Sequence, residues 1–164
     1  MVIEHWYKYR NQLSIALEFP NYINNTYPIL DIGSGTGWLT QHLSKYHHVI
    51  PIDINPNYFN NKVIVWPEYD TCINYFKNNP NSVGKCNMLI AWPCFNNYDI
   101  TSILLGKPIM IAIVYYKNIA CSTELFDFIE KTKLGLTNYT VIKYQNYLSY
   151  EAIILASIIK DMHT

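Results

Sequence analysis

Short apolar runs alternate along the chain with segments in which apolar residues recur at helical spacing. The runs are typical of buried strands, and the spaced apolar residues are typical of one helix face. The pattern predicts strands at residues 28–32, Val49–Asp53, Lys62–Trp66, Met88–Ala91, Ile109–Val114, Tyr139–Tyr144 and Glu151–Ile158. It predicts helices over residues 3–18, 38–46, 71–77, 96–105 and 122–135. Strands that alternate with helices predict an α/β fold.

Turn and capping residues mark where several of these elements end. Phe19-Pro20 ends the N-terminal helix, and Gly106 is expected to cap the helix over 96–105. Ser122 is expected to begin the next helix and Gly135 to end it. The last two strands follow each other so closely in sequence that they must be antiparallel.

The stretch from Pro28 to Thr40 reads as strand, glycine loop and helix. Gly33, Gly35 and Gly37 stand at every second position between the apolar run and Leu39. A dinucleotide fingerprint needs G-x-G-x-x-G, and here Trp38 stands where its third glycine would fall. A phosphate-binding Walker loop needs a Gly-Lys-Ser/Thr ending, which the loop lacks. The spacing therefore disfavours nicotinamide dinucleotides and nucleoside triphosphates as ligands.

Asp53 ends the next apolar run, Val49–Asp53. A carboxylate at the end of a second strand can accept hydrogen bonds from both hydroxyls of a ribose. Dinucleotide-binding folds use the same device, so Asp53 supports a nucleoside ligand without identifying it.

The sequence Asp31-Ile32-Gly33-Ser34-Gly35-Thr36-Gly37 resembles the first motif of class I S-adenosylmethionine (SAM) dependent methyltransferases. The resemblance implies a three-layer, Rossmann-like sheet of order 3-2-1-4-5-7-6, with the last strand antiparallel. It implies one SAM-binding domain over residues 1–164, with an N-terminal helix in 1–20 and a core over 28–159. In that family the loop wraps the amino-acid end of SAM, and the acid before it, here Asp31, anchors the ammonium. The resemblance places the cofactor against these residues: Asp31, Gly33, Ser34, Gly35, Thr36, Gly37, Asp53, Ile54 and Ala91.

Trp92-Pro93-Cys94-Phe95 follows the fourth predicted strand, at the position of the family's fourth motif. Amino-methylating members carry Asp/Asn-Pro-Pro-Tyr/Phe there. This chain keeps the first proline and the aromatic residue, and it is similar to methyltransferase-like proteins with Trp-Pro-Pro at this point. The resemblance implies that Trp92 and Pro93 position the methyl acceptor. Trp92, Phe95 and Tyr98 form either an aromatic wall for a planar acceptor or part of the core.

Several readings of the chemistry stay open. Pro93-Cys94 matches the dipeptide of cytosine-C5 methyltransferases, whose cysteine attacks the base, but the chain lacks their partner motif and recognition domain. Asp99, Glu68 and Glu124 are candidate general bases by position only. The leading hypothesis is a SAM-dependent methyltransferase. The alternative is a SAM-binding protein that does not transfer methyl groups.

Composition indicates which class of partner and which cellular compartment to expect. Twelve basic and twelve acidic residues give a formal net charge of zero, so no basic field indicates nucleic acid, and a small or peptide-like acceptor is expected. The four cysteines show no C-x-x-C spacing, which argues against a metal site and for a reducing compartment. No signal peptide and no membrane-length apolar run is seen, so a cytoplasmic protein without membrane contact is expected.

Overall fold

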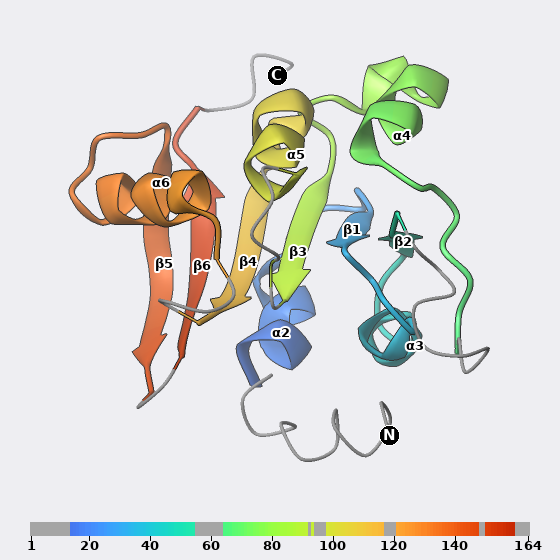
Figure 1. Cartoon of the computed structure of the whole chain (residues 1–164), viewed down its shortest axis with the longest axis horizontal. Coiled ribbons are helices and arrows are strands. Elements are labelled where there is room, and N and C mark those ends of the chain that lie inside the picture. The colour runs from blue at the N-terminus through green and yellow to red at the C-terminus, as the bar shows by residue number, and fades with distance from the viewer. Residues whose placement is uncertain are drawn as a thin grey trace.

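The structure is a computed structural model whose description covers residues 14–54, 64–91, 93, 98–116, 121–147 and 150–159. At its centre lies a six-stranded sheet of order β2-β1-β3-β4-β6-β5 (Figure 1). Neighbouring strands from β2 through β4 are parallel, whereas β6 is antiparallel to both β4 and β5. The strands are β1 (Ile29–Ile32), β2 (Val49–Ile52), β3 (Asn87–Ala91), β4 (Met110–Tyr115), β5 (Tyr139–Asn146) and β6 (Glu151–Ser157).

This order confirms the predicted Rossmann-like methyltransferase sheet, apart from its third strand. The strand predicted over Lys62–Trp66 is not formed at residues 64–66, and residues 62 and 63 lie outside the described part. The backbone amides of Ile64 and Val65 instead donate to the carbonyl oxygen of Thr36, at 2.7 and 3.0 Å. At this sheet edge the described residues contain only a parallel bridge between Ile52 and Tyr69. The glycine loop thus accepts hydrogen bonds from amides that a strand at this edge would have used.

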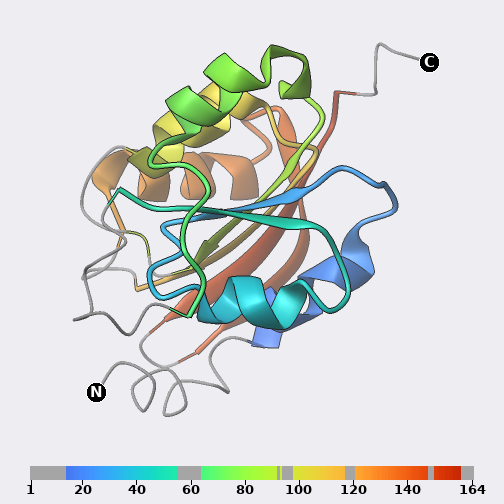
Figure 2. The same cartoon turned by 90° about the vertical axis from the view of Figure 1, so that its right-hand side faces the viewer.

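Helices cover both faces of the sheet, which gives three layers (Figure 2). One face carries α4 (Cys72–Asn78), α5 (Tyr98–Gly106) and α6 (Thr123–Lys133). The other face carries α2 (Ser14–Glu18), the 3-10 helix η2 (Phe19–Tyr22) and α3 (Trp38–Leu43). A second 3-10 turn, η3 (Pro80–Ser82), precedes β3. β1 to β4 are buried along their whole length, as strands covered on both faces must be.

Of the predicted N-terminal helix, only its end lies within the described residues. Ile15, Ala16 and Phe19 are fully buried in the core that also contains Ala112 and Ile154 of the sheet. The described part of this segment therefore packs on the sheet. Within the described residues, no helix is both long and apolar enough to cross a bilayer.

Helix ends follow the predicted capping chemistry at α6. The Ser122 hydroxyl accepts from the amide of Leu125 at 3.1 Å, and Gly135 adopts a φ of 73° just after the helix. At α5 the predicted cap is wrong, because Gly106 is the last residue of the helix and Lys107 after it takes the left-handed conformation with φ 46°. A Cβ on Gly106 would lie 2.5 Å from Met88 Cε and 2.7 Å from Phe76 Cζ. Gly106 is therefore required for packing and not for the turn.

Candidate functional site

The glycine loop joins β1 to α3 in a backbone path that requires glycine. Gly33, Gly35 and Gly37 have φ values of 72°, 57° and 81°, which side chains on L-residues disfavour. The amides of Gly33 and Ser34 donate to the carbonyl of Ile52 at 2.8 and 3.0 Å, which ties the loop to the end of β2. The loop thus lies at the carboxyl edge of the parallel strands, where open α/β sheets bind ligands.

Gly37 has a second reason to be glycine. A Cβ at this position would lie 2.6 Å from Val65 Cβ and 2.9 Å from the Val65 carbonyl oxygen. Gly37 therefore permits the chain after β2 to pack directly on the loop. The contact that requires glycine at position 37 is therefore a contact between two segments of the chain.

Two carboxylates flank the loop from adjacent strands. Asp53 follows β2 directly, and its Oδ2 accepts from the amide of Gly35 at 2.7 Å. Asp31 lies in β1 with only 2% of its surface exposed, and its Oδ2 accepts from the hydroxyl of Thr40 at 2.6 Å. The structure therefore brings Asp31, the glycines and Asp53 together as the sequence predicts. Thr40, in the first turn of α3, was not predicted.

Burial and charge make this site favourable for a cation. Burial raises the pKa of Asp31 to about 6; the Thr40 hydroxyl opposes this rise, and the negative charge of Asp53 adds to it. A positive group beside Asp31 would stabilise its ionised form. The amino-acid end of SAM carries such a group, so the acids fit the predicted cofactor.

The hydroxyls of the loop are a further feature of this edge. Ser34 Oγ and Thr36 Oγ1 are buried, and neither has a hydrogen-bond partner within the described part of the chain. Buried polar atoms without partners are uncommon, and at a ligand loop they mark positions where a ligand or water can bind. Ile54, next to Asp53, is 55% exposed, whereas Ala91 at the end of β3 is buried.

The segment predicted to hold the acceptor falls mostly outside the described residues. Trp92, Cys94 and Phe95 are among those not described, and Pro93, two residues beyond the end of β3, is buried. Tyr98 begins α5 and is 48% exposed. The acceptor-positioning roles of Trp92, Pro93, Phe95 and Tyr98 stay predictions.

Asp99, one of the acids named as a candidate base, lies in the first turn of α5. It is 6% exposed, and its Oδ2 has no hydrogen-bond partner among the described residues. Burial raises the pKa of Asp99 to about 7.

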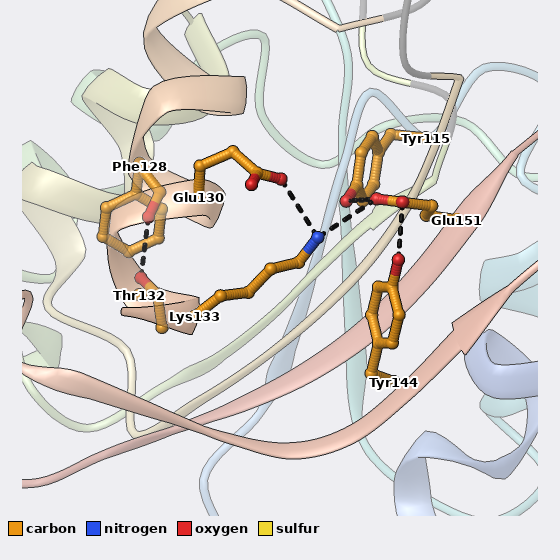
Figure 3. Close-up of polar contacts among 7 residues, drawn as sticks. All are labelled: Tyr115, Phe128, Glu130, Thr132, Lys133, Tyr144 and Glu151. Carbon is orange, nitrogen blue, oxygen red and sulfur yellow. Dashed lines mark hydrogen bonds and ion pairs between the residues drawn. The ribbon is translucent and has the colours of Figure 1, made fainter. Parts of the chain in front are cut away.

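A hydrogen-bond network centred on a buried carboxylate occupies the α6 side of the same sheet edge (Figure 3). Glu151, at the start of β6, accepts from the hydroxyls of Tyr115 and Tyr144, the latter at 2.5 Å. Lys133 Nζ lies 3.4 Å from Glu151 Oε2, 3.0 Å from Glu130 Oε1 and 4.5 Å from the centre of the Tyr144 ring. Burial and the hydrogen bond to Glu151 raise the pKa of Tyr115. The buried Glu151 carboxylate therefore has several donors that compensate for its burial.

On the α2 side of this edge, three tyrosines that the sequence analysis did not single out lie together. They are Tyr116, Tyr147 and Tyr150. Fifteen tyrosines are spread through the chain, so composition alone could not distinguish these three.

A shallow cavity of about 430 Å³ lies away from these residues, between η2 and the end of α3. It is lined by Leu17, Pro20, Asn21, His42, Leu43, Lys45 and Tyr46. None of the predicted site residues belongs to it, because this cavity lies toward the amino ends of the parallel strands. We place the candidate site at the carboxyl edge on the geometry of the loop and its acids.

Comparison with known proteins relates this architecture to methyltransferase structures. No family model and no curated protein sequence matches the chain. An rRNA methylase from Streptococcus thermophilus is similar in structure, with a TM-score of 0.63 and 14% identity over 90% of this chain and 96% of that one. An rRNA methylase from Escherichia coli has a TM-score of 0.50 and 11% identity, over 90% and 64% of the two chains.

A third similar structure is a proposed methyltransferase in complex with S-adenosylhomocysteine. It has a TM-score of 0.57 and 11% identity, over 88% of this chain and 49% of that one. At such low identity these likenesses establish the fold, and they confirm the predicted class I methyltransferase architecture.

The comparisons also correct the expectation about partners. A small or peptide-like acceptor, with nucleic acid not indicated, was expected from the zero net charge. That expectation is wrong, because similar structures include rRNA methylases. Net charge sums over the whole chain, so it carries no information about contacts made to bases at one edge.

Proposed function

We propose that this protein binds SAM at the β1–α3 glycine loop and transfers its methyl group to an acceptor in RNA. One observation carries the proposal: the loop amide of Gly35 and the carboxylate of Asp53 meet at 2.7 Å, at the carboxyl edge of a methyltransferase sheet. The rRNA methylases among the similar structures support RNA as the class of acceptor. The SAM-binding unit is the single domain expected over 1–164, with its core in 28–159.

The residues at the loop divide the binding between them. Asp53 is proposed to accept the ribose hydroxyls, and Asp31 to hold the ammonium group through its buried carboxylate. Ser34 and Thr36 present hydroxyls without partners in the described chain, and Ile54 and Ala91 offer apolar contacts to the cofactor. When bound, SAM supplies a methyl group on a sulfonium sulfur, which is already activated for displacement.

The chain's main task in such a transfer is alignment. Holding acceptor and donor in line can accelerate a displacement greatly, without a strong base in the protein. Pro93 fixes its own φ two residues beyond β3, so it is suited to hold the neighbouring segment rigidly. The in-line geometry and the positioning role of Trp92 and Pro93 are part of this proposal.

Calorimetric titration with S-adenosylhomocysteine tests the cofactor assignment. The wild-type protein should bind S-adenosylhomocysteine and not NAD. Asp53→Ala should weaken binding by about 1.5–3 kcal/mol, the usual contribution of hydrogen bonds to a charged group. Gly35→Val should abolish binding, because its φ of 57° excludes a branched side chain. Asp127→Ala, on the exposed side of α6, serves as a matched control that should bind normally.

Methyl transfer is tested separately with SAM carrying a labelled methyl group and total RNA as the acceptor. Label in the RNA, dependent on Asp53, is the expected result. Normal cofactor binding with no label in RNA would leave the SAM site standing and contradict the RNA acceptor.

A further inference from the structure

A β-bulge in β5 changes which residues face α2. Val141 pairs with Leu155 and Lys143 with Ile154, so one residue, Ile142, is inserted between them. Val141 packs against the core on the α6 side, whereas Lys143 Nζ reaches Glu18 of α2 at 2.8 Å. A bulge shifts side-chain alternation by one residue. Lys143, Gln145 and then Tyr147 therefore face α2, although Val141 does not.

The bulge thereby brings Tyr147 to two other tyrosines. The rings of Tyr147 and Tyr150 stack with centroids 4.2 Å apart and 10° between their planes. Tyr116 meets Tyr150 edge-on, with centroids 6.3 Å apart and a 72° angle. The Tyr147 hydroxyl contacts Ser14 Oγ at 3.3 Å and donates to Gln145. The stack on Tyr150 orients the ring, and the hydroxyl contacts add to this.

The group lies at the edge of the sheet that carries the glycine loop. Tyr116 directly follows β4, and Tyr150 directly precedes β6, which is antiparallel to β4. Only β3 separates β4 from β1, so Tyr116 lies about 10 Å along the edge from the loop, given the spacing of about 4.8 Å between strands. That separation suits a group that holds an acceptor beside a cofactor.

Tyr116 and Tyr147 are both partly exposed, whereas Tyr150 is only 4% exposed and supports the other two rings from the core. Aromatic faces bind unpaired bases by stacking, with little dependence on base identity. We propose that Tyr116, Tyr147 and Tyr150 form a stacking platform that receives an unpaired RNA base next to the methyl-transfer site. This inference rests on the proposed function and specifies how its acceptor is held.

Base stacking and phosphate contacts differ in their dependence on salt. A protein that binds RNA mainly through phosphates loses affinity steeply as salt rises. Binding through a tyrosine platform neutralises no phosphate, so it should depend only weakly on salt. The salt dependence therefore separates this platform from a basic patch.

A short single-stranded RNA that contains 2-aminopurine tests the platform, because stacking on an aromatic ring quenches the fluorescence of this base. In the presence of S-adenosylhomocysteine, the wild-type protein should quench it with a shallow salt dependence. Tyr147→Leu should weaken RNA binding at least tenfold and abolish quenching, and Tyr147→Phe should preserve both. Tyr46→Leu, a tyrosine 77% exposed near the amino ends of the strands, should behave like the wild type.

Calorimetry with S-adenosylhomocysteine on every variant keeps the two proposals distinguishable. Absence of S-adenosylhomocysteine binding by the wild-type protein would overturn the proposed function. Normal cofactor binding, with equal RNA quenching by wild type and Tyr147→Leu, would overturn the platform alone. Absence of quenching by the wild type would also overturn it. If Tyr147→Leu does not fold, as judged by circular dichroism, Tyr116→Leu takes its place with the same expected results.

Discussion

At the scale of single residues, two buried acids depart furthest from their ordinary chemistry. Asp31 is compensated by the Thr40 hydroxyl, whereas Asp99 Oδ2 has no partner among the described residues. An ionised carboxylate without compensation is costly inside a protein, so Asp99 retains its proton up to about pH 7. Asp99 should therefore reduce the stability of the fold at neutral pH.

Asp99→Asn should be more stable than the wild type at pH 8, and this advantage should be smaller at pH 4. In the unfolded chain the carboxyl ionises near its ordinary pKa of 3.8, and in the folded protein it ionises at about 7. The free energy of unfolding of the wild type should therefore fall as pH rises from 4 to 7, by roughly 3 kcal/mol from this group. The variant should lack this fall.

Urea denaturation at a series of pH values measures the Asp99 effect. Asp127→Asn is the control, since Asp127 forms an exposed ion pair with Lys131 and should change stability by less than about 1 kcal/mol. Parallel pH profiles for wild type and Asp99→Asn would show that Asp99 is hydrated in solution.

At the scale of elements, the end of α5 has two requirements, close packing and a left-handed turn residue. Sequence analysis assigns both to one glycine, but the structure divides them between two residues. Gly106 is needed for its lack of a side chain, and Lys107 adopts the turn conformation with φ 46°. The sequence pattern alone could not separate these roles, because a glycine at a helix end usually serves the turn. Only the positions of Met88 and Phe76 show that Gly106 serves packing.

Lys107→Gly should stabilise the protein, and Gly106→Ala should destabilise it. The first change removes left-handed strain of about 1–2 kcal/mol. The second inserts a Cβ against Phe76 and Met88, and overpacking of this kind costs about 1–3 kcal/mol. Chemical denaturation of both variants measures whether each change raises or lowers the free energy of unfolding. Gains of stability in both would mean that the core beneath α5 can relax around a methyl group.

The hydrogen bonds around Glu151 lead to a second prediction at the scale of elements. Tyr115→Phe removes a hydroxyl that donates to a buried carboxylate, so it should cost about 1.5–3 kcal/mol. Tyr144→Phe removes a donor from a residue that is 40% exposed, where water can replace it, and should cost less. Thermal unfolding of the two variants measures the difference. Equal losses would indicate that Glu151 is hydrated equally on both sides.

At the scale of the whole molecule, the order of the sheet was predictable and its edges were not. Continuous apolar runs such as Ile109–Val114 identify central strands, because both faces of such a strand are buried. At the edge, the choice between a strand and a loop at Ile64 and Val65 depends on hydrogen bonds to Thr36, far away in sequence. The candidate site divides in the same way. Its glycines and acids carry a local pattern, whereas the three tyrosines meet only in the folded protein.

Amide hydrogen exchange should show the same division between centre and edge. The amides of β4 lie between β3 and β6 on fully buried strands, so they should exchange only through global unfolding. The amides of β2 and β5, at the ends of the strand order, should exchange faster through local opening. Mass spectrometry of peptic fragments measures both. Uniform protection across the sheet would contradict this expectation.

The bulge at Ile142 also affects how this chain should be aligned with its relatives. With Ile142 removed, Lys143 would follow Val141 directly, so Lys143, Gln145 and Tyr147 would keep the α2 side in a ladder of regular alternation. A relative that lacks the inserted residue can therefore still place a tyrosine on the α2 side at the position that aligns with Tyr147. An alignment without a gap at 142 would instead shift every following residue by one and would match Tyr147 to a residue on the opposite face.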